Sequence, residues 1–152
     1  MSEKIQTDMT SEPVSIASDV TIGEAQEVMR NWGMRHLPVV DGAELVGVIS
    51  DRDILRAFAT QKSGKTEVEF MMTKSPYRVR QDIDVAAVAK AMAENKYGCA
   101  IVTDNRDQVI GVFTTTDALQ LLSRILHSPD EVDYHILSLS EYFFWQKKVR
   151  TE

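Results

Sequence analysis

The strongest constraint on this chain is an internal repeat. Residues 9–41 align with residues 72–104 at a constant shift of 63, and residues 44–55 align with residues 108–119 at a shift of 64. Eleven of these 45 aligned pairs are identical, and the one extra residue of the second copy falls at a turn. A constant register of this kind indicates two copies of one structural unit. Because so small a unit cannot bury both faces of its own sheet, we expect the copies to pack on each other.

Each copy has the pattern of a short strand, a helix, two strands and a second helix. In the first copy, Thr21 and Glu24 form a capping box ahead of apolar residues at spacings of three and four, and Gly33 ends the helix. Ser50 is expected to cap the second helix. We therefore predict an α/β repeat pair with one joint core. The predicted elements lie at 13–16, 22–33, 37–40, 45–49 and from 51 in the first copy, and at 77–79, 85–95, 99–103, 108–113 and from 115 in the second.

The predicted boundaries divide the chain into four parts. These are a first repeat at 1–62, a linker at 63–67, a second repeat at 68–126 and a C-terminal helical tail at 127–152. In the tail, Ser128 is a suitable N-cap and Pro129 occupies the first helical position. Its apolar and aromatic residues favour a helix packed on its own repeats. Docking of this helix on a second subunit or a protein partner is the alternative, since aromatic anchors are enriched at interfaces.

Charge and cysteine content exclude several classes of protein. Lys and Arg number 17 against 23 Asp and Glu, which gives a net charge of −6. This balance disfavours binding to nucleic acid or to an anionic membrane surface. No apolar run approaches the roughly 18 residues of a membrane span, and a single cysteine excludes an internal disulfide. We expect a soluble cytoplasmic protein.

Familiar catalytic motifs are absent from the sequence. It contains no H-E-x-x-H, no paired CxxC and no G-x-S-x-G. Cys99 lies in an apolar strand, where a buried inert thiol is favoured over a nucleophile. We therefore predict no catalytic residues, no metal site and no required cofactor, so that the protein is not an enzyme.

One polar motif follows a glycine-containing strand in both copies, at 47–53 and at 111–117. Its hydroxyl residue starts a helix, where exposed N–H groups and the helix dipole favour an anion. Asp53 or Asp117, one turn later, can accept two hydrogen bonds from a vicinal diol, so phosphate and ribose would be bound by neighbouring residues. The S/T-x-x-D pattern is also an ordinary capping box. The residues alone leave both interpretations open.

Taken together, these motifs resemble those of the CBS (cystathionine β-synthase) domain family. The resemblance covers residues 5–125 and rests on paired segments in the same order: Met9-Thr10, Pro13-Val14, 35–41 and 47–53, then Met72-Thr73, Pro76, Val102, Asp104 and 111–117. It implies a pseudo-twofold pair of CBS repeats and a homodimer as the common assembly. It also implies two clefts between the repeats that bind a regulatory adenosine nucleotide (AMP, ADP or ATP) or a related adenosyl compound.

By this resemblance, each cleft takes residues from both repeats. The expected Asp117 cleft comprises Thr114, Thr115, Thr116 and Asp117 with Val14, Ser15, Ile16, Arg35, His36 and Arg52. The expected Asp53 cleft comprises Ser50, Asp51 and Asp53 with Tyr77, Arg78, Val79, Gly98 and Cys99. Because Arg35, His36 and Arg52 have the uncharged counterparts Gly98, Cys99 and Thr116, we expect the Asp117 cleft to bind a charged nucleotide more tightly.

The expected function is therefore a ligand sensor. A bound adenosine ligand would change the geometry of the repeats or of a dimer and so regulate a partner. The alternative is a non-catalytic dimerisation or scaffold protein, with degenerate clefts and an aromatic C-terminal helix that binds a partner.

Overall fold

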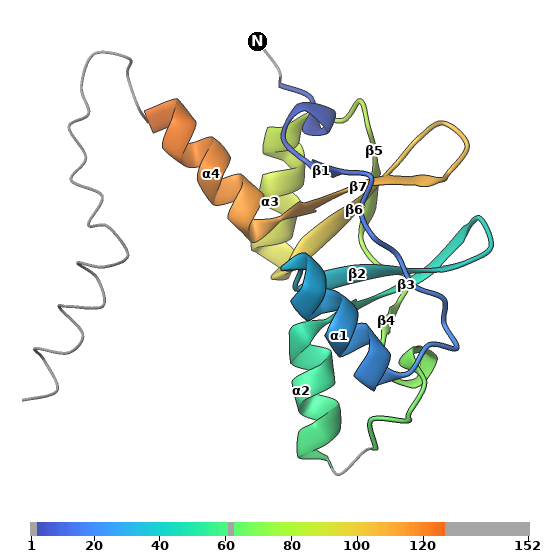
Figure 1. Ribbon diagram of the computed structural model, residues 1–152. Coiled ribbons are helices and arrows are strands. Elements are labelled where there is room, and N and C mark those ends of the chain that lie inside the picture. The colour runs from blue at the N-terminus through green and yellow to red at the C-terminus, as the bar shows by residue number, and fades with distance from the viewer. Residues whose placement is uncertain (1–2, 61–62, 127–152) are drawn as a thin grey trace, which may run out of the picture. The chain divides into compact units, whose positions relative to one another are not determined.

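The computed structural model describes residues 3–60 and 63–126 (Figure 1). The chain divides into two compact units, Met1–Leu121 and Leu122–Glu152, and both β-sheets lie in the first. The predicted tail helix at 127–152 lies outside the described residues. In the described part, no helix is long and apolar enough to cross a membrane.

The element order confirms the predicted α/β repeat. The first copy contributes β1 (Thr10–Ser11), α1 (Ile22–Trp32), β2 (His36–Asp41), β3 (Glu44–Ser50) and α2 (Asp51–Ala59), preceded by the 3-10 turn η1 (Ile5–Thr7). The second contributes β4 (Thr73–Lys74), β5 (Arg78–Arg80), α3 (Val85–Asn95), β6 (Cys99–Thr103), β7 (Val109–Thr114) and α4 (Thr115–Leu126), preceded by η2 (Val68–Phe70). The extended segment predicted at 13–16 makes a single parallel bridge, from Ile16 to Val39.

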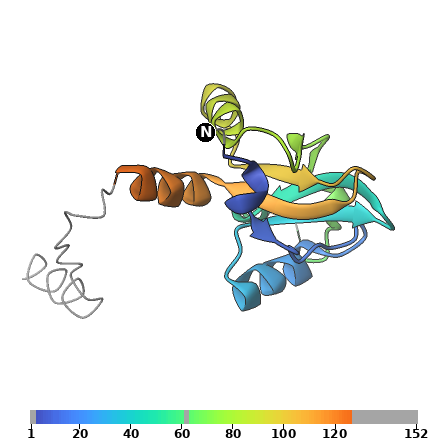
Figure 2. The same ribbon diagram turned by 90° about the horizontal axis from the view of Figure 1, so that it is seen from above.

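Two sheets form, and each borrows a strand from the other copy. One sheet has the order β1-β7-β6-β5 and the other β2-β3-β4. Strand β1 comes from the first copy but pairs with β7, and β4 comes from the second copy but pairs with β3. Seen from above, the strands lie between α1 on one side and α3 on the other (Figure 2).

The borrowed strands belong to longer leading segments that exchange places. Ile5 and Val68, equivalent residues in the repeat, are both fully buried. Ile5 packs in the core of the second copy, and Val68 packs in the core of the first. Backbone hydrogen bonds fix both, from Ile5 N to Ile83 O at 3.1 Å and from Val68 N to Val20 O at 2.7 Å. Each copy therefore completes the core of the other.

Helix starts follow the local sequence as predicted. The capping box at Thr21 and Glu24 opens α1, and Gly33 ends it in the left-handed conformation with φ of 64°. A second capping box at Ser50 and Asp53 opens α2. The segment before η2 supplies carbonyls to free N–H groups at the start of α1, from Ile22 N to Thr66 O at 2.8 Å and from Gly23 N to Gly64 O at 3.0 Å.

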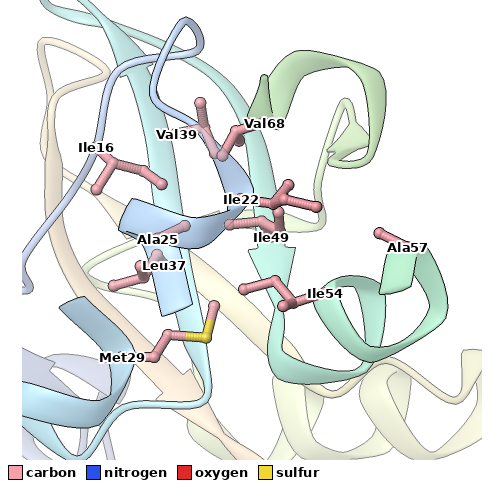
Figure 3. Packing of buried hydrophobic residues seen from close by; sticks show 10 residues of the cluster. All are labelled: Ile16, Ile22, Ala25, Met29, Leu37, Val39, Ile49, Ile54, Ala57 and Val68. Carbon is pink, nitrogen blue, oxygen red and sulfur yellow. The ribbon is translucent and has the colours of Figure 1, made fainter. Parts of the chain in front are cut away.

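Apolar side chains gather in three clusters. Figure 3 shows the first, in which α1, α2, β2 and β3 converge: Ile16, Ile22, Ala25, Met29, Leu37, Val39, Ile49, Ile54, Ala57 and Val68. The second is its counterpart in the other copy. The third joins the copies, because Val48 of β3 packs with Cys99 and Ile101 of β6 and Val112 of β7. Each copy thus has a core of its own, and this third cluster packs the two copies against each other, as the small size of each unit requires.

The exchanged segments pack closely on two equivalent glycines. A Cβ atom added at Gly47 would overlap the Met72 side chain and lie 3.0 Å from the Thr73 carbonyl oxygen. One added at Gly111 would overlap Met9 in the same way. Glycine at these two strand positions lets the borrowed segment approach the backbone.

We predict that Gly47→Ala destabilises the fold by about 1–3 kcal/mol, because the added methyl group must displace Met72 and the backbone of β4. Urea unfolding measures the change. Gly64→Ala is the matched control, since a Cβ there lies 3.7 Å from Phe58 in ordinary contact, and its effect should stay within about 0.5 kcal/mol. Equal effects of the two substitutions would contradict the proposed close packing.

Candidate functional site

The two polar motifs form capping boxes of nearly identical geometry. Asp53 Oδ2 accepts hydrogen bonds from Ser50 N at 2.9 Å and from Ser50 Oγ at 2.7 Å. Asp117 Oδ2 accepts from Thr114 N and Thr114 Oγ1, both at 2.7 Å. Each aspartate therefore commits one carboxylate oxygen to the helix start, and its other oxygen takes no part in the cap.

A cleft of about 560 Å³ lies beside Asp53. This volume falls in the range of small-molecule sites. Residues from both repeats line it: His36, Val48, Ser50, Arg52, Asp53 and Arg56 from the first, and Thr73, Ser75, Pro76, Tyr77, Arg78, Lys96, Tyr97, Gly98 and Cys99 from the second. We call this the Asp53 cleft.

Most of the residues predicted for the Asp53 cleft are brought together there. The six that line it are Ser50, Asp53, Tyr77, Arg78, Gly98 and Cys99. Asp51 lines a separate groove with residues of α1 and α2. Val79 packs against the core of the second copy and pairs with Val102 of β6.

His36 and Arg52 are placed differently from the prediction. Both were assigned to the Asp117 cleft, but both line the Asp53 cleft. His36 lies against Gly98, where an added Cβ would be 2.8 Å from His36 Nε2. The bare backbone at Gly98 leaves room for this imidazole to cross toward the second copy, which the sequence pattern did not reveal.

The residues predicted for the Asp117 cleft are only partly connected. Arg35 Nη2 donates a hydrogen bond to Thr116 Oγ1 at 2.9 Å, which links the first copy to the start of α4. Thr115 N donates to Gly98 O at 3.2 Å. Val14 is half-buried and Ser15 is exposed, whereas Ile16 is buried in the first core.

Cations gather around Asp53, whereas we expected the more basic surroundings at Asp117. Four cations line the Asp53 cleft: Arg52, Arg56, Arg78 and Lys96. Their counterparts in the repeat are Thr116, Gln120, Ser15 and Gly33, which are all uncharged. Of the cations predicted for the Asp117 cleft, Arg35 is the one that does not line the Asp53 cleft. The Asp53 cleft is therefore the electropositive one.

Sequence reasoning missed several lining residues, above all Lys96, Tyr97 and Arg56. Lys96 and Tyr97 directly precede Gly98, which was predicted, so the signal was their position at the end of α3. The rings of Tyr77 and Tyr97 are stacked, with centroids 5.1 Å apart and an interplanar angle of 26°. Arg56 lies one turn after Asp53, and its Nη1 is 3.6 Å from Asp53 Oδ1.

Burial sets the protonation of the less polar groups in the cleft. It lowers the pKa of His36 from the ordinary 6.5, an effect partly opposed by the neighbouring carboxylate of Asp51. Burial also raises the pKa of the Cys99 thiol to about 11, which keeps it protonated and unreactive at neutral pH. The pKa of Tyr77 is raised by burial and by Tyr97. Within the described residues, no cluster of His, Cys, Asp or Glu is arranged to hold a metal ion.

Comparison with known proteins identifies the family. The CBS domain model matches residues 3–60 and 67–124. This chain belongs to the CBS domain family, with two copies of the domain in tandem.

Solved structures of CBS pairs share the fold. The CBS domain pair of protein MJ0100, in complex with 5′-methylthioadenosine and S-adenosyl-L-methionine, has a TM-score of 0.77 and 27% identity, covering 82% of this chain and 99% of that one. CBSX2 of Arabidopsis thaliana, in complex with AMP, has a TM-score of 0.69 and 25% identity, covering 82% of this chain and 98% of that one. Both are CBS pairs that bind adenosyl compounds.

Likeness to enzymes is confined to part of their length. Inosine-5′-monophosphate dehydrogenase of Korarchaeum cryptofilum is 30% identical over 118 residues, which make up 78% of this chain and 24% of the enzyme. The chain thus spans about a quarter of that relative.

We predict that protonation of His36 destabilises the fold as the pH falls below 6.5. Because the folded state holds the His36 pKa below the ordinary 6.5, the unfolded chain takes up the proton first. The fold therefore keeps its full stability above pH 6.5 and loses some as the pH falls toward the folded pKa. Urea unfolding from about pH 7.5 to about pH 5 should show a smaller loss in His36→Gln than in the wild type. Equal losses, or a His36 pKa above 6.5 by NMR titration, would contradict this.

Proposed function

We propose that this chain is a regulatory module that binds an adenosine nucleotide or adenosyl ligand in the Asp53 cleft. The observation that carries the proposal is the grouping of a diol-binding carboxylate, a helix N-terminus, four cations and an aromatic pair around one cavity of about 560 Å³. The adenosyl ligands of the related CBS pairs support the same ligand class.

Each part of such a ligand has a matching group in the cleft. The ribose diol donates hydrogen bonds to Asp53, whose Oδ1 is free of the cap. The phosphate lies at the start of α2 beside Ser50, where the helix dipole favours an anion. The adenine ring stacks on Tyr77, which already stacks on Tyr97.

Regulation follows from the composite wall of the cleft. Ser50 and Asp53 belong to the first copy, and Tyr77, Arg78 and Tyr97 to the second. A ligand that contacts both copies stabilises the arrangement in which those contacts form, and so shifts the population of conformations. No catalytic step is part of this proposal.

We predict that Asp53→Asn weakens binding of AMP, ATP or S-adenosylmethionine by at least about 10-fold, since a hydrogen bond to a charged group is lost. Isothermal titration calorimetry measures this. Asp117→Asn is the matched control, because it disturbs the equivalent capping box at Thr114. It should leave affinity at the Asp53 cleft within about 2-fold.

Two other outcomes would change the conclusion. Loss of binding in Asp117→Asn alone would move the ligand to the Asp117 cleft. Absence of binding by every adenosyl ligand would favour the alternative function, a non-catalytic dimerisation or scaffold protein.

We also propose that the protein is a homodimer that pairs through α1 and α2. Trp32, Leu55 and Phe58 expose 67%, 62% and 40% of their surface on these helices, and exposed apolar patches of this kind mark interaction sites. Leu55→Glu should convert a dimer to a monomer in sedimentation velocity, because it buries a carboxylate in the interface. Arg106→Glu, an exposed substitution in the turn between β6 and β7 and outside α1 and α2, serves as the charge control. A monomeric wild type would refute the proposal.

A further inference from the structure

The cations of the Asp53 cleft exceed what one phosphate requires. We infer that this cleft selects an adenine nucleotide with two or three phosphates over AMP and over the cationic S-adenosylmethionine, and that Lys96 is a specificity-determining residue for the added phosphates. This inference rests on the proposed function and names the ligand class of the same site.

The internal repeat shows that these cations are not needed for folding. At the equivalent position of the opposite copy each of them is replaced by an uncharged residue (Thr116, Gln120, Ser15 and Gly33), and both copies nevertheless form the same two helices and the same antiparallel strand pair, α1, α2, β2 and β3 against α3, α4, β6 and β7. Their concentration in one cleft of a chain with net charge −6 creates a local field that attracts a polyanion. A monophosphate carries too little charge to use all four.

Lys96 stands at a backbone position that favours glycine. It ends α3 in the left-handed conformation with φ of 58°, as Gly33 ends α1 with φ of 64°. A side chain costs free energy in this conformation, and glycine does not. Lysine at this position adds a cation to the cleft but costs free energy at the end of α3, where glycine would be more stable. A purely structural role would not explain the choice of lysine.

Arg35 and Arg52 differ in whether another side chain of the protein holds their guanidinium group. Arg35 is tied to Thr116 by its hydrogen bond of 2.9 Å. In the repeat, Gly98 is the counterpart of Arg35, and Arg52 is the counterpart of Thr116. Because glycine has no side chain, no hydrogen bond equivalent to that between Arg35 and Thr116 can form at Arg52. The Arg52 guanidinium makes no ion pair among the described residues and lines the cleft. It is therefore available to a ligand.

Arg56 is positioned to respond to the ribose. Its Nη1 lies 3.6 Å from Asp53 Oδ1, the oxygen that the ribose diol would use. Its side chain is 70% exposed, so this pair is weak. Ribose binding displaces the guanidinium from Oδ1 and leaves it free to contact a phosphate.

The test compares ATP, AMP and S-adenosylmethionine by calorimetry at fixed ionic strength. We expect the wild type to bind ATP at least about 10-fold more tightly than AMP, since one further charge-assisted contact is worth that much. Lys96→Gly installs the residue of the first copy. It should remove about 5-fold or more of the ATP affinity, leave AMP within about 2-fold, and unfold at the same or a higher temperature because the backbone strain is relieved.

Lys74→Ser is the matched control. It removes the same charge, also installs the residue of the first copy (Ser11), and changes an exposed side chain that does not line the cleft. It should leave both affinities within about 2-fold. Arg56→Gln, which installs the counterpart Gln120, should weaken ATP more than AMP.

The outcomes separate this inference from the proposed function. AMP binding as tight as ATP binding, or equal losses in Lys96→Gly and Lys74→Ser, would overturn the selectivity while leaving an adenosyl-binding module. Absence of binding by all three ligands would overturn both.

Discussion

Everything else in this molecule depends on the exchange of leading segments between its two copies. Ile5 fills the core of the second copy and Val68 that of the first, so neither core is complete without the other half of the chain. Burying a residue of this size stabilises the fold by roughly 1.5–3 kcal/mol. The exchange therefore makes the two copies one cooperative unit, although the sequence divides them cleanly.

The same exchange builds the cleft. Met72 packs over Gly47, β4 (Thr73–Lys74) pairs with β3, and Ser75 and Tyr77, which follow β4, line the cleft. These residues of the second copy are thereby placed beside Ser50 and Asp53 of the first. The cleft contains residues of both copies because the segment that buries Val68 in the core of the first copy continues directly into the residues that line the cleft. A ligand bound there would contact both copies at once.

Local signals in the sequence predicted local structure well. The capping boxes at Thr21 and Ser50 and the helix at 85–95 depend on residues three or four apart, and all are confirmed. Strands β1 and β4 escaped prediction because two residues show no periodicity, and the partners of β1 lie about 100 residues away. The existence of a cleft at Asp53 followed from the repeat and the family resemblance. The position of His36 in that cleft did not follow, since it depends on the space left by Gly98 on the opposite copy.

Comparison of the two copies distinguishes residues that the fold requires from residues that serve only the cleft. Both keep the aspartate of the capping box, because Asp53 and Asp117 satisfy N–H groups at a helix start whether or not a ligand is present. Only Asp53 has Arg52 and Arg56 of its own copy and Lys96 of the other copy around it, and these like charges repel one another when the cleft is empty. Their exposure to solvent keeps this repulsion small. A polyanion removes it and adds direct attraction, so the free energy gained on binding increases with each negative charge the ligand carries into the cleft.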